Sequence, residues 1–189
     1  MIGVAVQKHL FNVADYHYLA KTRLFKEDDH IELIEGEIID MAPIGPPHTS
    51  IVTRLTDLFY ELYRKSAIVR VQNPIQLGDG SEPEPDIALL RLREDLYAVA
   101  HPTNKDVLLS VEVAETSLKY DRDVKVPLYA VHAIPEVWIV DVIKQRIEIY
   151  REPSDGIYQT KLTVKKGQTL TPTGLESPRE IKVEQILGL

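Results

Sequence analysis

The chain has 189 residues, a formal net charge of -7 and no cysteine. Hydrophobic residues make up 44% of the sequence and charged residues 27%, which is typical of globular proteins and not of disordered ones. The lack of cysteine excludes disulfides, zinc–thiolate sites and cysteine nucleophiles, and the acidic charge argues against a protein that coats nucleic acid through charge alone. We expect one domain over residues 1–189, because this length supports a single core.

Neither a signal peptide nor a membrane span is recognisable. Residues 1–10 are too short for a signal peptide and lack a small-residue cleavage pattern. The longest apolar runs are far shorter than the roughly 20 residues that a membrane helix needs. We therefore expect a soluble, cytoplasmic protein with no membrane partner.

The first third of the chain predicts a helix, a hairpin and a second helix. Residues 12–21 begin with an asparagine, which can cap the first turn of a short helix. Residues 30–41 predict two short strands joined at a Glu-Gly turn. After a loop with three prolines at 42–48, apolar residues recur at helical spacing and predict a helix over 49–65.

The middle of the chain predicts strands separated by turns. Residues 67–77 predict a strand that a proline interrupts, and the cluster of glycine, proline and acidic residues at 78–85 predicts a turn. Residues 86–92 predict a short strand, and 93–106 a loop or brief helix. The β-branched residues of 106–114 predict a longer strand.

The last third predicts one helix and three strands. Residues 117–132 have one apolar helical face, although Pro127 should kink the helix. The almost wholly apolar run 136–142 predicts a strand buried on both faces, and 146–151 with 158–164 predict an antiparallel pair. This order of elements predicts an α/β fold, with a central mixed β-sheet flanked by helices and an extra β-hairpin toward each end.

Two acids stand out in the predicted strands. Asp86 opens the apolar run 86–92, and Glu112 lies inside the apolar run 106–114. If these strands are neighbours, the two carboxylates can meet and offer the oxygen ligands that a hard divalent ion such as Mg²⁺ prefers. Such an ion can polarise a phosphodiester and lower the pKa of a bound water.

A lysine on the following predicted helix would complete such a site. Lys125 comes thirteen residues after Glu112 and can stabilise the charge that develops on an attacked phosphate, and Asp121 lies on the same helical face. The residues alone leave simpler readings open. Asp86 can be an ordinary turn acid, Glu112 can lie at a solvated sheet edge, and Lys125 with Asp121 can form a surface pair.

Three segments together resemble the Uma2 family, also called DUF820. They are "HIELIEGEIIDMAPIGPPH", "QNPIQLGDGSEPEPDIALLR" and "SVEVAETSLKYDRDVKVPLYAVHAIPEVWIVD", in the order and spacing of the family. Members are described as restriction endonucleases, are abundant in cyanobacteria, and are placed in the PD-(D/E)XK nuclease superfamily. The resemblance therefore implies a restriction-endonuclease-like PD-(D/E)XK core.

The resemblance also implies roles for single residues. Asp86, with the proline before it, matches the first half of the signature, and Glu112 matches the acid of the second half. The usual lysine two residues later is absent, because Ala114 stands there. In this family a lysine on the next helix is thought to replace it, and Lys125 holds that position. This implies Asp86, Glu112 and Lys125 as catalytic residues, with Asp86 and Glu112 as metal ligands.

Four further residues are secondary candidates by the same resemblance. Asp121 precedes the lysine in the run "YDRDVK", Glu32 and Glu37 lie in the N-terminal hairpin, and His48 closes the proline loop. Without the resemblance, Glu32 and Glu37 read as ordinary hairpin acids, and His48 reads as a residue near a helix N-terminus.

The function expected from this set is a Mg²⁺- or Mn²⁺-dependent endonuclease that hydrolyses phosphodiester bonds of DNA. A homodimer is implied by the superfamily, because cutting both strands of a duplex needs two active sites. The alternative is a catalytically inactive module on the same fold that binds DNA or a protein partner, which the acidic net charge and the missing signature lysine favour. A small-molecule hydrolase has less support, because no G-x-S-x-G sequence and no cysteine nucleophile is present.

Overall fold

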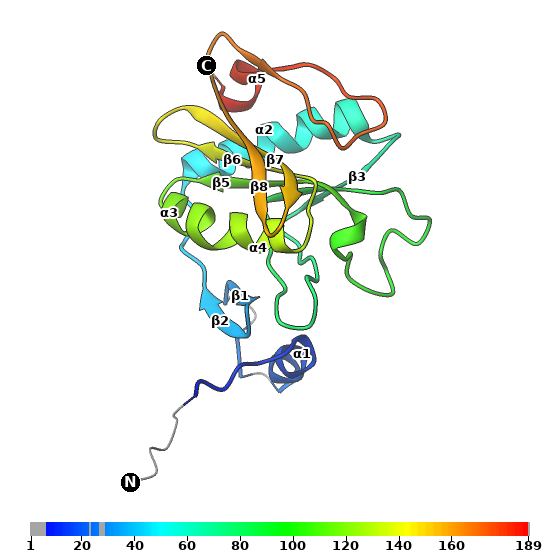
Figure 1. Cartoon of the computed structure of the whole chain (residues 1–189), viewed down its shortest axis with the longest axis vertical. Coiled ribbons are helices and arrows are strands. Elements are labelled where there is room, and N and C mark those ends of the chain that lie inside the picture. Colours follow the sequence, from blue (N-terminus) through cyan, green and yellow to red (C-terminus); the bar gives the residue numbers. More distant parts are fainter. Residues whose placement is uncertain (1–6, 23, 27–28, 189) are drawn as a thin grey trace.

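Six strands form one central mixed sheet (Figure 1). The computed structural model describes residues 7–22, 24–26 and 29–188. In the sheet β5 and β6 run parallel, and the other neighbouring pairs are antiparallel. The strands, in their order across the sheet, are β3 (Ile68–Val71), β4 (Ile87–Leu90), β5 (Val107–Ala114), β6 (Glu136–Asp141), β7 (Arg146–Ser154) and β8 (Ile157–Lys165).

Helices cover both faces of this sheet, so the α/β architecture predicted from the sequence is confirmed (Figure 1). On one face, α2 (Pro46–Tyr63) and α5 (Val183–Leu187) pack in an apolar cluster around Phe59 and Trp138. On the other face, α4 (Val126–Val131) packs Leu128 and Tyr129 against the sheet. β5 and β6 are buried along their whole length because they lie between these two layers.

Smaller elements lie around the sheet. The short helix α1 (Val13–Lys21) is capped by Asn12, as its sequence predicts, and β1 (Ile31–Ile34) pairs with β2 (Glu37–Asp40) as a separate hairpin. Near the C-terminus β9 (Thr169–Leu170) pairs with β10 (Ile181–Lys182). The predicted C-terminal hairpin is β7 with β8, and it continues the central sheet instead of forming a second one.

Two of the differences from the predicted element boundaries lie close to the ends of β3 and α2. α2 begins at Pro46 and not at residue 49, because proline at the first helical position has its φ already set and lacks only an N–H that would have no partner there. β3 ends at Val71 and does not reach residue 77, because Gln72 has a positive φ of 49°, which breaks an extended chain. The loop before α2 therefore ends at residue 45, and Gln72 directly follows the end of β3.

The segment predicted as one kinked helix has three parts. It consists of α3 (Leu118–Tyr120), the π-helical segment η2 (Asp121–Lys125) and α4. Pro127 has no N–H to donate and its ring crowds the carbonyl one turn earlier, so it disturbs the α-helical bonding just before it. The chain here takes the wider π-helical form, which occurs frequently at functional sites.

No helix among the described residues is long and apolar enough to span a bilayer.

We predict that Phe59→Ala lowers the free energy of unfolding by about 3–5 kcal/mol, because it removes a ring that is fully buried against Trp138 at a centroid distance of 5.8 Å. Tyr60→Ala is the matched control, since the next residue of the same helix is 57% exposed. It should change stability by less than about 0.5 kcal/mol. Urea unfolding followed by far-UV circular dichroism measures both, and equal losses would contradict the packing described.

Candidate active site

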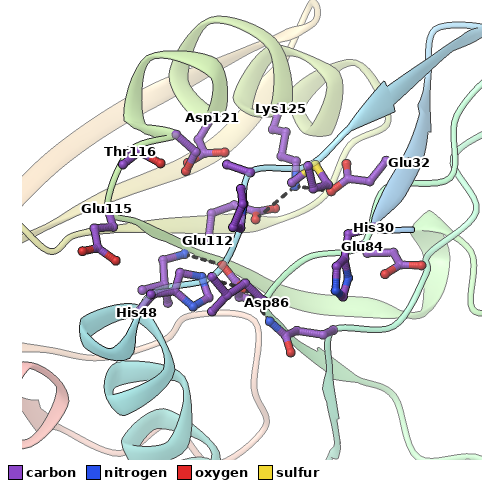
Figure 2. A pocket seen from close by; sticks show the side chains of 18 residues that line it. His30, Glu32, His48, Glu84, Asp86, Glu112, Glu115, Thr116, Asp121 and Lys125 are labelled. Carbon is purple, nitrogen blue, oxygen red and sulfur yellow. Dashed lines mark hydrogen bonds and ion pairs between the residues drawn. The ribbon is translucent and has the colours of Figure 1, made fainter. Parts of the chain in front are cut away.

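A cavity of about 450 Å³ opens where β4 begins and β5 ends (Figure 2). It is walled by these strands, the segment from Thr116 to Lys125, the start of α2 and the hairpin residue Glu32. Among the described residues that line it, six carboxyl groups and two histidines accompany one lysine. The titratable lining residues are His30, Glu32, His48, Glu84, Asp86, Glu112, Glu115, Asp121 and Lys125.

The antiparallel register of β4 and β5 brings Asp86 and Glu112 to one place. Ile87 pairs with Val111, so the residues just outside this pair, Asp86 and Glu112, lie at opposite positions of neighbouring strands. Side chains alternate along a strand, and both acids belong to the face that α4 covers. The backbone N–H of Val113 donates to Asp86 Oδ2 at 2.8 Å and so fixes this carboxylate beside β5.

Lys125 reaches this point from η2 and ends between two acids. Its Nζ donates to Glu32 Oε1 at 2.8 Å and to Glu112 Oε2 at 3.3 Å, with all three side chains buried (Figure 2). Burial lowers the pKa of Lys125, but Glu112, Glu32 and Asp121 together outweigh it, so the pKa is raised above its ordinary value. The ammonium is therefore charged at neutral pH.

Glu112 is buried between Lys125 and Tyr129. Burial raises its pKa well above the ordinary value, while Lys125 acts in the opposite direction. The Tyr129 hydroxyl donates to Glu112 Oε1 at 2.5 Å, so each oxygen of this carboxylate has a partner. Glu32 is less well satisfied. Burial raises its pKa too, and its Oε2 is buried with no hydrogen-bond partner among the described residues.

Asp121 and His48 line the same cavity. Asp121 Oδ2 accepts a hydrogen bond from Ser117 Oγ at 2.7 Å, and burial raises the pKa of Asp121. His48 Nε2 lies 3.0 Å from Asp86 Oδ1, while its Nδ1 is buried with no partner among the described residues. Burial lowers the pKa of His48, but the hydrogen bond and charge of Asp86 outweigh it, so the pKa is raised.

The excess of buried carboxylates suits a hard divalent cation. Lys125 is shared by Glu32 and Glu112, which leaves Asp86 and Asp121 without a lysine of their own at this point. Mg²⁺ is usually held by one or two carboxylates, with waters and substrate phosphates filling its other positions. Asp86 and Glu112 offer two carboxylates at this point, and Glu32 Oε2 has no hydrogen-bond partner among the described residues.

Sequence reasoning and structure agree on most members of this cavity. Of the seven residues singled out in the sequence, Glu37 is the one that does not line it. Glu37 lies on β2, half exposed, 2.5 Å from the ammonium of Lys8. Ala114, at the position of the missing signature lysine, is buried, and Lys125 from η2 points to the same acids instead.

Three titratable lining residues were missed: His30, Glu84 and Glu115. Burial and the neighbouring Glu32 raise the pKa of Glu84. A signal for Glu84 was present, since it lies two residues before Asp86 and so on the same side of an extended chain. No comparable spacing marks His30 or Glu115.

We predict that Glu112→Gln makes the free energy of unfolding depend less on pH. Burial raises the folded-state pKa of Glu112 above its ordinary value of 4.5, so the folded protein holds a proton that the unfolded chain releases. That contribution is fully present below pH 4.5 and is lost as the pH rises through the raised value.

Urea unfolding in EDTA at several values between about pH 5 and pH 8 measures this dependence. The fall in stability with rising pH should be shallower in Glu112→Gln than in the wild type, and unchanged in the control Glu37→Gln. Equal slopes in all three proteins would contradict a raised pKa at Glu112.

Comparison with known proteins assigns the chain to a family. The family model Uma2, described as "Putative restriction endonuclease", matches residues 13–184. No curated protein matches the chain. A solved structure described as a "putative nuclease belonging to DUF820", from Anabaena variabilis ATCC 29413, is similar with a TM-score of 0.72 and 15% identity, over 94% of this chain and 98% of that chain. At this identity the likeness shows the fold, and the family match shows that the chain belongs to the Uma2 family.

Proposed function

We propose that this chain is a Mg²⁺- or Mn²⁺-dependent endonuclease that hydrolyses phosphodiester bonds of DNA in the cavity described above. The observation that carries the proposal is the buried Lys125 ammonium held beside Glu112, on the strand next to Asp86. Two strand acids and a lysine at one point are the groups that metal-assisted phosphodiester hydrolysis requires. Membership of a family described as restriction endonucleases supports the same conclusion.

Asp86 and Glu112 are the proposed metal ligands. The ion, when bound, supplies Lewis acidity toward the phosphate and lowers the pKa of a water ligand. Asp86 is well placed for this role because Val113, His48 and Gln72 fix its orientation, with Gln72 Nε2 at 3.3 Å from Oδ1. Partners of this kind hold a ligand in one geometry and lower the cost of binding the ion.

Lys125 is proposed to face the negative charge that develops on the phosphate. Its ammonium is already charged and already placed, so no reorganisation is needed when the substrate arrives. Glu32 is a positioning residue in this scheme, because its Oε1 accepts a hydrogen bond from Nζ at 2.8 Å and holds the ammonium beside Glu112. The position of Lys125 on η2 explains how the site keeps its cation although Ala114 replaces the signature lysine.

DNA as substrate and a homodimer as the active form belong to this proposal. A pair of identical chains provides two active sites, one for each strand of a duplex. The chain as a whole is acidic, with a net charge of -7, so the ions in the cavity and local basic residues would have to draw in the phosphate backbone. The single domain and the cytoplasmic location also stay predictions.

We predict that Lys125→Met reduces Mg²⁺-dependent cleavage of DNA by about 100-fold or more, since removing one preorganised group that stabilises transition-state charge typically has this effect. Lys119→Met is the matched control, because Lys119 lies on the same helical segment with 91% of its side chain exposed. Nicking and linearisation of supercoiled plasmid measure the rate. Equal rates in the two variants would remove Lys125 from the mechanism.

Asp86→Asn tests the metal site in the same way, with Asp123→Asn as control, because Asp123 is exposed and its ion pair among the described residues is with Lys119. We expect Asp86→Asn to lose cleavage and to weaken Mn²⁺ binding in calorimetry by at least about 10-fold. Should the folded wild type bind no divalent ion and cut no DNA, the chain is instead a binding module on a nuclease fold.

A further inference from the structure

A second cluster of metal-ligating side chains lies outside the cavity, where α1 meets the loop before β4. His17, Glu82 and His101 each offer one ligand atom there, and these three atoms all lie within 4.8 Å of one another. Among the described residues, no other group of three such side chains has its ligand atoms this close together. We propose that the His17–Glu82–His101 cluster binds a divalent transition-metal ion of the zinc class, at a site separate from the proposed catalytic one.

The distances in the cluster suit such an ion. His17 Nε2 lies 2.8 Å from Glu82 Oε1 and 3.0 Å from Oε2, and the rings of His17 and His101 are 6.0 Å apart at 67°. Zinc ligands lie about 2.1 Å from the metal, which puts neighbouring ligand atoms of a tetrahedron about 3.4 Å apart. Small rotations of the side chains would therefore open the cluster enough to admit the ion.

The donor set selects the kind of metal. Two imidazole nitrogens and one carboxylate suit zinc and the neighbouring transition metals, whereas Mg²⁺ prefers oxygen ligands alone. Three protein ligands leave a fourth position for water, and the His17 side chain, at 40% exposed, leaves that position near solvent. The cavity around Asp86 offers mainly carboxylates, so the two sites differ in chemistry as well as in place.

The burial of Glu82 gives the cluster an energetic reason to bind a cation. Its side chain is 4% exposed, and a buried carboxylate is costly unless it is paired. Its partner in this structure is a histidine, which is charged only when protonated. A divalent ion bound by Glu82 and both histidines would neutralise the carboxylate at any pH at which the imidazoles are neutral.

The backbone beside each ligand is already fixed. Hydrogen bonds join α1 to the loop of Glu82, that loop to the hairpin, and the loop of His101 to the segment after β3. Metal binding would therefore require little ordering of the chain, which lowers its entropic cost. These bonds are Val13 N to Asp79 O at 2.7 Å, Glu82 N to Leu33 O at 2.7 Å, and Gln76 N to Pro102 O at 2.8 Å.

The ion would act as a clamp on the segment that leads into the cavity. Glu82 comes four residues before Asp86, and its N–H bonds to the carbonyl of Leu33, the neighbour of Glu32. A metal ion that links Glu82 to α1 and to the loop of His101 would stabilise two segments near the proposed catalytic acids. One leads to Asp86, and the other holds Glu32. The expected role is therefore structural, and it is measurable without any cleavage assay.

The test uses the full chain carrying Asp86→Asn and Glu112→Gln, which removes the proposed cavity ligands. After EDTA treatment and dialysis, Zn²⁺ is titrated by calorimetry, and thermal unfolding is followed with and without Zn²⁺. We expect one Zn²⁺ per chain and a raised Tm. Adding His17→Ala or His101→Ala should each weaken Zn²⁺ binding by at least about 10-fold and abolish the rise in Tm. His9→Ala is the control, since His9 is exposed outside the cluster.

His101→Ala is the decisive variant, because no hydrogen bond joins His101 to the His17–Glu82 pair among the described residues. Should Zn²⁺ binding be unchanged by His101→Ala in a protein with an unaltered circular dichroism spectrum, the cluster is an ion pair and the proposal is wrong. The same holds if the parent protein binds no Zn²⁺. Neither result bears on the cleavage experiments with Lys125 and Asp86, so the two proposals can fail independently.

Discussion

The buried contact of Lys125 with Glu32 and Glu112 joins three parts of the fold at one point. Glu32 belongs to the separate hairpin, Glu112 to the central sheet and Lys125 to the helical layer. Moving these charges out of water costs several kcal/mol for each ion, and their mutual attraction offsets this only if the geometry is kept. These ion pairs therefore contribute little net stability. They instead fix the hairpin, the sheet and the helical layer in one relative position.

Local sequence patterns account for most strands of the sheet and for four residues of the site, Asp86, Glu112, Asp121 and Lys125. The apolar runs that hold Asp86 and Glu112 mark two strands, and the two acids meet once these strands are assumed to be antiparallel neighbours. The contact between Glu32 and Lys125 spans 93 positions of the sequence, and no spacing rule reaches that far. Only the resemblance to the family singled out Glu32, and it singled out Glu37 equally, although Glu37 lies at the turn end of the hairpin, opposite Ile34, and pairs with Lys8.

The remaining differences have physical causes that a single sequence does not display. Whether Thr49 or Gly45 starts a helix depends on how the two prolines after Gly45 are tolerated, and the structure uses one of them as the first helical residue. The His17–Glu82–His101 cluster is drawn from a helix and two loops, so tertiary packing alone brings it together.

The π-helical segment η2 has a consequence for how this part of the chain tolerates length changes. A turn closed by i→i+5 bonds holds one more residue than an α-helical turn. Asp121 and Lys125 therefore face the cavity while Leu128 and Tyr129, a turn later, still face the sheet. Deleting one residue here would remove the wider turn, and the two ends of the helical segment would then rotate by about 100° relative to each other. Either Lys125 would leave the cavity, or Leu128 and Tyr129 would lose their apolar contacts. The extra residue therefore allows one helical segment to supply both the site and the core.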